Sequence, residues 1–237
     1  MANLPLTLNP VAIAILGGVL PALLWLFFWL HEDNKNPEPK GLIFITFIAG
    51  MMTAGIIYAF KYPILTYIFP LLSQGGQLIL LSTLEELLKF AAFFFIAFRS
   101  ISYDEPIDAV IYLVTAALGF AAAENILYLF GDLSRVGALA ALLNGSSRFI
   151  GATILHTISS MIIGIAMAYS FYSGKFVKTI AVLLGLAASI LLHTYFNLTI
   201  MSTKGTLNVL MAFTPYWVAL VIIIVILEFV KRLKQPI

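Results

Sequence analysis

The sequence predicts an all-α protein, a polytopic integral membrane bundle of about seven transmembrane helices. Two observations concern composition: 62% of the 237 residues are hydrophobic and 10% are charged, whereas globular domains are about 45–50% apolar and about 25% charged. A third is that polar residues divide the chain into apolar segments, each near the roughly 20 residues that cross a bilayer. A soluble chain of this length could not bury so much apolar surface, so the lipid bilayer is its expected surroundings.

Seven segments qualify as spans, and together they make one transmembrane domain over residues 1–237. In chain order they cover about residues 10–30, 41–60, 76–98, 107–130, 149–172, 177–200 and 208–232. The pieces 62–72 and 136–143 are too short to cross alone. Either piece is a candidate for an eighth span, so the predicted number of spans is seven or eight.

Lysine and arginine predict the orientation, because cytoplasmic loops carry an excess of these residues. One side of a seven-span bundle holds Lys35, Lys40, Arg99, Lys175, Lys178, Lys231, Arg232 and Lys234. The other side holds only Lys61, Arg135, Arg148 and Lys204. The sequence therefore predicts a multi-pass cell-membrane protein with an extracytoplasmic N-terminus and a cytoplasmic C-terminus.

The composition also excludes several partners and chemistries. A formal net charge of only +2 argues against a nucleic-acid partner, which would call for a strongly basic surface. The chain has no cysteine, so disulfides, a thiol nucleophile and a thiolate metal site are all excluded.

Charged, histidine and asparagine residues lie deep in four of the apolar spans. A charge at mid-bilayer costs about 2.5–3.5 kcal/mol, so these groups are expected to face the protein interior and to have partners. They are Glu85, Glu86 and Lys89 on the third span, Glu124 and Asn125 on the fourth, His156 on the fifth, and His193 and Asn197 on the sixth.

The depths of these groups agree. At a rise of about 1.5 Å per residue, Glu85 lies roughly 12 Å into its span, and Glu124 lies roughly 9 Å before the end of its own. His156 and His193 lie roughly 10 Å from the start and the end of their spans. Consecutive spans run antiparallel, so all of these positions fall at one level on the predicted extracytoplasmic side. The sequence predicts a single cluster.

Two carboxylates and two imidazoles gathered away from water suit acid–base chemistry on a water molecule. The same groups could bind zinc or another divalent metal, with Glu86, His156 and His193 as ligands, because two histidines and a glutamate form a catalytic zinc arrangement. No serine elbow, GxGD-like carboxylate pair or HExxH helix is present. Structural alternatives stay open: Glu85 and Lys89, at i,i+4, can form an ion pair that fixes helix packing, and His156 can be a hydrogen-bonded core residue.

Several blocks of the sequence resemble, in the same order, the motifs of the PrsW family of intramembrane proteases. "EELLK" (85–89) resembles its EExxK signature, and "LLHTYFN" (191–197) resembles its final HxxxN. The other similar blocks are "HEDNKNPEP" (31–39), "DEPIDAVIYLVTAALGFAAAENILY" (104–128) and "RFIGATILHTISSMIIG" (148–164). The sequence departs from the family pattern at Ala109 and Leu113, where glycine is common.

The resemblance implies an intramembrane endopeptidase that cuts a membrane-anchored protein or peptide, an anti-sigma factor in the best-known case, on the outer side of the membrane. A more distant similarity to the CAAX-protease and bacteriocin-processing family implies that the catalytic residues are Glu85, Glu86, His156, His193 and Asn197. Residues that would support them or contact the substrate are Lys89, Glu124, Asn125 and Arg148.

Two mechanisms stay open for such a protease. Either Glu86 or Glu85 is a general base with the histidines as partners, or a glutamate and the histidines hold zinc. In both, Asn197 would donate a hydrogen bond to the oxyanion, a role worth about 2.7–4 kcal/mol. The missing HExxH spacing and the second glutamate slightly favour the metal-free mechanism.

Two other functions also place glutamate and histidine inside a membrane. One is a proton-coupled transporter or channel, although the repeat symmetry common in transporters is not visible here. The other is a catalytically inactive scaffold that binds membrane proteins. The complete set of polar groups weighs against the second.

Overall fold

The structure, a computed structural model, describes residues 9–32, 36–136, 138–203 and 206–234, and the side chains at 134, 136, 138–150 and 206–210 are outside this description. Every regular element in the described part is helical. In chain order the helices are α1 (Pro10–Glu32), α2 (Lys40–Pro63), α3 (Gln74–Ile96), α4 (Asp108–Val136), α5 (Ala138–Tyr169), α6 (Lys175–Ser202) and α7 (Thr206–Val230). A π-helical turn, η1 (Ile64–Ile68), and a 3-10 turn, η2 (Phe69–Leu71), follow α2.

The polytopic all-α prediction is confirmed, and each helix overlaps one predicted span. Six described segments are long and apolar enough to cross a membrane: Pro10–Glu32, Lys40–Leu71, Asp108–Leu133, Gly151–Tyr169, Lys175–Ser202 and Met211–Val230. The remaining helix, α3, has 23 residues, as many as α1. It differs because it carries Glu85, Glu86 and Lys89 near its middle.

Neither of the two short apolar pieces forms a separate span in the described part of the chain. Residues 62–72 prolong α2 through η1 and η2, so that Lys40–Leu71 is one continuous helical segment. Residues 138–143 belong to α5, which begins at Ala138, well before the predicted start at 149. The run "ALAALL" consists of strong helix formers, which explains the earlier start.

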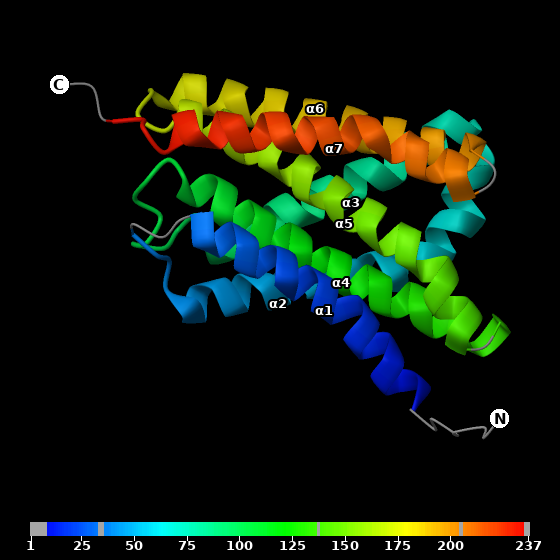
Figure 1. The fold of residues 1–237 in the computed structure, drawn as a ribbon. Coiled ribbons are helices and arrows are strands. Elements are labelled where there is room, and N and C mark those ends of the chain that lie inside the picture. Colours follow the sequence, from blue (N-terminus) through cyan, green and yellow to red (C-terminus); the bar gives the residue numbers. More distant parts are fainter. Residues whose placement is uncertain (1–8, 33–35, 137, 204–205, 235–237) are drawn as a thin grey trace.

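The helices form three layers (Figure 1). α1 and α2 cover one side of α4, and α6 and α7 lie on the opposite side of the bundle, with α3 and α5 between them. α4 packs against α1, α2, α3 and α5, and it is buried almost continuously from Asp108 to Ala122. The hydrophobic core therefore follows α4, which carries Glu124.

Glycine allows the close crossing of α2 and α4. A Cβ on Gly50 would lie 2.0 Å from the carbonyl oxygen of Ala116, and a Cβ on Gly119 would lie 2.0 Å from that of Phe47. No side chain fits at such distances, so each helix presents a glycine to the backbone of the other. Small residues at such crossings are common where membrane helices pack closely.

The first turn of α3 is fixed by local hydrogen bonds. Ser73 is its N-cap, and its hydroxyl accepts a hydrogen bond from the amide of Gly76 (3.3 Å), as a capping serine is expected to do. The side-chain amide of Gln77 donates to the carbonyl oxygens of Phe69 (3.0 Å) and Leu72 (3.3 Å). These bonds join α3 to the η2 turn and hold the helix that carries the two adjacent glutamates.

Polar contacts hold the end of the bundle where α1 and α7 finish. Lys231 donates to Glu32 at 2.6 Å and to Glu228 at 2.7 Å, so it connects the end of α1 to the end of α7. At the same end, Asn36 donates to Glu105. The loops there are tied to one another, while the cluster of intramembrane polar groups lies further along the helices.

Candidate active site

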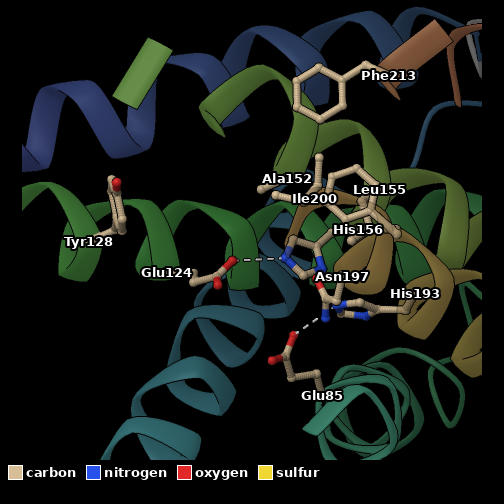
Figure 2. A pocket seen from close by; sticks show the side chains of 11 residues that line it. Glu85, Glu124, Tyr128, Ala152, Leu155, His156, His193, Asn197, Ile200 and Phe213 are labelled. Atoms are coloured by element: carbon tan, nitrogen blue, oxygen red, sulfur yellow. Dashed lines mark hydrogen bonds and ion pairs between the residues drawn. The ribbon is translucent and has the colours of Figure 1, made fainter. Parts of the chain in front are cut away.

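The polar residues predicted to form one cluster come together from four helices. α3 contributes Glu85, α4 contributes Glu124, α5 contributes His156 and α6 contributes His193 (Figure 2). The centroids of the two imidazole rings are 5.2 Å apart, and the rings meet edge to face. The prediction that equal depth would unite these groups is confirmed.

A cavity of about 320 Å³ lies against this cluster. Its lining residues are Glu85, Glu124, Tyr128, Ala152, Leu155, His156, His193, Phe196, Asn197, Ile200 and Phe213. Four of the five residues expected to be catalytic therefore face one space, together with Glu124. Tyr128 of α4 and apolar side chains of α5, α6 and α7 form the rest of the wall, so the cavity combines a few polar groups with an apolar lining, as ligand sites commonly do.

Glu86, the fifth expected residue, is not on this wall. Its side chain is completely enclosed, and it lies among hydrogen-bond donors. The hydroxyl of Ser159 donates to its Oε1 (3.1 Å) and the hydroxyl of Ser189 donates to its Oε2 (2.9 Å). Nδ1 of His193 lies 2.6 Å from Oε1. Such a carboxylate has no room for a substrate and acts through the groups that it holds.

Lys89 pairs with Glu86 rather than with Glu85. Its ammonium lies 2.7 Å from Oε1 of Glu86, at i,i+3, and both side chains are 0% exposed. The i,i+4 ion pair that the sequence allowed between Lys89 and Glu85 is thus replaced by an ion pair with the neighbouring glutamate. Lys89 also donates to the hydroxyl of Ser159 (3.3 Å) and lies 3.1 Å from Nδ1 of His156. This buried ammonium reaches α5 as well as its own helix.

Glu86 and Glu85 lie next to the two ring nitrogens of His193. An ionised carboxylate only accepts hydrogen bonds, so Nδ1 of His193 donates to Glu86. In the neutral ring, Nε2 then carries the lone pair, and it lies 3.6 Å from Oε2 of Glu85. A histidine whose other nitrogen donates to a carboxylate is the usual arrangement for a metal ligand or an oriented base.

His156 is held between Lys89 and Glu124. An ammonium can only donate, so Nδ1 of His156 accepts from Lys89. In the neutral ring the proton is then on Nε2, which lies 3.0 Å from Oε2 of Glu124. The side chain of Glu124 is 30% exposed, and the ring of Phe120 packs edge to face on the imidazole with centroids 5.0 Å apart.

The described cluster contains a set of residues that fits a metal ion. Glu85, His156 and His193 each offer one ligand atom, and the three atoms lie within 4.8 Å of one another. Donors on one tetrahedral zinc ion lie about 3.3–3.6 Å apart, so these atoms would have to close by about 1 Å. Binding through Nε2 of His156 would also require the ring proton to move to Nδ1, and the hydrogen bond from Lys89 would then be lost. The carboxylate in the set is Glu85, whereas the sequence suggested Glu86.

Of the supporting residues predicted from the sequence, Asn125 does not reach the cavity, and the side chain of Arg148 cannot be placed. Asn125 is fully buried, and its amide donates to the hydroxyl of Thr153 (3.5 Å), so it joins α4 to α5 away from the cavity. Arg148 lies on α5, and its side chain is outside the described part of the chain.

Two functional side chains, Ser159 and Ser189, were missed from the sequence. Both donate to Glu86. Ser159 is three residues after His156 and Ser189 is four before His193, so helical spacing places each on the same face as its histidine. That spacing could have identified them, but serine is too common in apolar helices to stand out alone.

Comparison with known proteins identifies the family of this chain. The sequence profile of the PrsW family intramembrane metalloprotease matches residues 38–227. "Protease PrsW" of Oceanobacillus iheyensis is 30% identical over 210 residues, which cover 87% of this chain and 90% of that protein. "Protease PrsW" of Geobacillus kaustophilus is 29% identical over 166 residues, covering 68% of this chain and 65% of that protein.

"Protease PrsW" of Bacillus subtilis is 24% identical over 207 residues, covering 85% of this chain and 89% of that protein. No solved structure matches the chain. The matched region contains all four helices of the cluster. The chain therefore belongs to the PrsW family of intramembrane metalloproteases.

Proposed function

We propose that this chain is an endopeptidase that hydrolyses a peptide bond of a membrane-anchored protein in the cavity beside Glu85, His156 and His193. The observation that carries the proposal is the cavity itself. It is about 320 Å³ in size, and two imidazoles and two carboxylates face it within a bundle of apolar helices. Hydrolysis needs water, a proton acceptor and a polar partner for the carbonyl oxygen, and the cavity provides space and side chains for all three.

The donor set and the family description favour a metal-dependent reaction, with Glu85, His156 and His193 as the ligands. A bound zinc ion would lower the pKa of a coordinated water to about 7 and polarise the peptide carbonyl. Glu86 holds His193 by its Nδ1 and so presents Nε2 towards Glu85. Lys89 balances the charge of Glu86.

The other cavity residues have proton-transfer and positioning roles. Glu124, partly exposed and beside His156 on the cavity wall, accepts a proton from the attacking water and returns it to the leaving amine. Asn197, on the same wall, donates a hydrogen bond to the carbonyl oxygen of the substrate. Without a metal, Glu85 takes over as the general base, because Glu86 is enclosed and cannot reach a substrate.

The substrate that we propose is a membrane-anchored protein of the kind that the family resemblance implies, such as an anti-sigma factor. Cleavage takes place near the extracytoplasmic leaflet. The excess of Lys and Arg on the opposite side of the bundle supports this orientation.

The test is cleavage of single-span substrates by purified protein in liposomes. Glu85→Gln removes the carboxylate from the cavity and is expected to lower the cleavage rate at least about 100-fold. The matched control is Glu228→Gln, which alters an exposed glutamate at the far end of α7 and should leave the rate unchanged. Equal rates for both variants, or proton-coupled transport without cleavage, would show that the proposal is wrong.

Metal analysis of the same preparation separates the two mechanisms. One zinc ion per chain, with loss of cleavage on chelation and recovery on adding zinc back, is the expected result. His193→Ala should then lower the bound zinc as well as the rate. Full activity in chelated, metal-free protein would instead establish Glu85 as the base.

A further inference from the structure

A second cavity, of about 290 Å³, lies on the other side of the carboxylates of Glu85 and Glu124. Its walls come from α2, η1, α3 and α4, whereas the first cavity is walled mainly by α5, α6 and α7. Glu85, Glu124 and Tyr128 line both cavities. These three residues are therefore the boundary at which the two spaces meet.

The chemistry of the second cavity differs from that of the first. Seven of its twelve lining residues are purely apolar: Ala54, Ile57, Ile64, Leu65, Leu81, Phe120 and Leu127. Neither histidine of the cluster lines it. Its remaining residues are Tyr58, Lys61 and Tyr128 and the two carboxylates that it shares with the first cavity. Its volume and the apolar majority of its lining suit one large apolar side chain.

The backbone beside this cavity is irregular. Ile64 and Leu65 belong to the π-helical turn that follows α2 at Pro63, and both line the cavity. Regular α-helix is interrupted here in an apolar segment of 32 residues. Short π-helical turns occur frequently at functional sites, so the interruption gives a second, independent reason to assign this cavity a role.

We propose that the second cavity binds a large apolar side chain, of the size of Leu, Met or Phe, on a substrate residue next to the cleaved bond. This inference rests on the proposed function. A protease acts on an extended peptide, in which successive side chains point to opposite sides. A peptide bond held at Glu85 and Glu124 can thus place one neighbouring side chain in the apolar cavity and the other in the cavity with the histidines. Together the two cavities form one substrate groove across the carboxylates.

The first test compares substrates that differ only in the residues flanking the cleaved bond. With Leu or Phe at the preferred flank, wild-type kcat/KM should exceed that of the Ala substrate at least about tenfold, because apolar pockets discriminate by this amount. Ile57→Trp and Leu81→Trp fill the cavity and should abolish the preference while the Ala substrate is still cleaved. Wild-type protein that cleaves all flanking residues equally would overturn the proposal.

Matched controls on the same helices are available. Ile56→Trp and Ile79→Trp add the same bulk to α2 and α3 at exposed positions outside the cavity, where Ile56 is 44% and Ile79 is 50% exposed. Both should keep the wild-type preference. Loss of the preference in these controls to the same extent as in Ile57→Trp and Leu81→Trp would overturn the proposal. Thermal unfolding of all four variants identifies any that fail to fold.

A binding measurement separates this inference from the proposed function. Glu85→Gln protein is incubated with a substrate that carries photoreactive leucine at the flanking position, and cross-linked residues are identified by mass spectrometry. Cross-links to Ile57, Leu81 or Leu127 support the cavity as the side-chain site, whether or not wild-type protein cleaves. Cross-links confined to Phe196, Ile200 or Phe213 of the first cavity would overturn it. Absence of cleavage by the wild type concerns the proposed function instead.

Discussion

Glu86 and Lys89 form a pair of opposite charges with no exposure at all, inside an apolar bundle. Taking both charges from water is costly, and the pair is tolerated because the carboxylate oxygens are also held by Ser159, Ser189 and His193. At the scale of single residues, this network determines how His193 is presented to the cavity. The Glu86–Lys89 pair makes no contact with the cavity itself, and it acts on the site by holding His193.

Removing one member of the pair is therefore expected to be worse than removing both. Lys89→Met leaves the carboxylate of Glu86 buried without its cation, and should lower the free energy of unfolding by about 3–5 kcal/mol. The double variant Glu86→Gln with Lys89→Met should regain most of that stability. Thermal and denaturant unfolding in detergent measures both. A single variant as stable as the double variant would show that the pair is not coupled.

A substitution at Asn197 tests whether this side chain donates a hydrogen bond to the carbonyl oxygen of the substrate. Asn197→Ala should lower kcat about 10²- to 10³-fold by removing a donor to the carbonyl oxygen, while unfolding is little changed. Thr199→Ala is the control, because that hydroxyl donates to the backbone of Tyr195 on α6 (2.8 Å) and does not line the cavity. Similar kcat values for the two variants would exclude the oxyanion role.

At the scale of elements, the crossing of α2 and α4 positions the acidic wall of the site. Gly50 and Gly119 let the two backbones approach, and Phe120 and Glu124 follow on α4 at the faces that meet the cavities. The depth of Glu124 relative to α3 and α5 consequently depends on a contact made by residues with no side chain. Sequence periodicity alone contains little information about such a contact.

A methyl group at this crossing should be costly. Gly119→Ala would place its Cβ 2.0 Å from the carbonyl oxygen of Phe47, and the overpacked crossing should lose about 1–3 kcal/mol of stability. Gly55→Ala on α2 is the control, since a Cβ there meets nothing within 4 Å and alanine is the better helix former by up to about 1 kcal/mol. Unfolding temperatures of the two variants should move in opposite directions. A shift of the same sign in both would contradict the crossing.

In the whole molecule, the contacts that hold the helix ends and the polar cluster lie in different parts of the bundle. The end where α1 and α7 finish is held by Lys231, Glu32 and Glu228, while the polar cluster lies between the helices and opens to two cavities. The seven helices are apolar towards their surroundings, with many large hydrophobic side chains exposed. Lipid is the expected solvent for that surface.

The orientation of the bundle in the membrane is tested by fusions. Because Lys and Arg favour one side eight to four in the sequence, a reporter fused to the C-terminus should be active in the cytoplasm. A second reporter in the turn between α4 and α5 should be active outside it. The opposite pattern would place the cavity in the other half of the membrane and contradict the proposed site of cleavage.

The sequence by itself determined the helices and the existence of the cluster. Bilayer thickness sets the length of an apolar span, so the positions of all seven helices could be predicted to within a few residues at most ends. Equal depth in antiparallel spans brought His156, His193, Glu85 and Glu124 together. The end of α4 and the start of α5 were the exceptions, because a helix can continue beyond the apolar stretch that crosses the membrane.

Only the tertiary structure decided what each glutamate does. Adjacent residues on a helix point about 100° apart, so Glu85 and Glu86 had to face different neighbours, but the sequence does not contain the rotation of α3 about its axis. That rotation follows from packing against α2, α4 and α6. Because of this rotation, Glu86 points into the buried network formed by Lys89, Ser159, Ser189 and His193. Glu85 points to the wall that both cavities share.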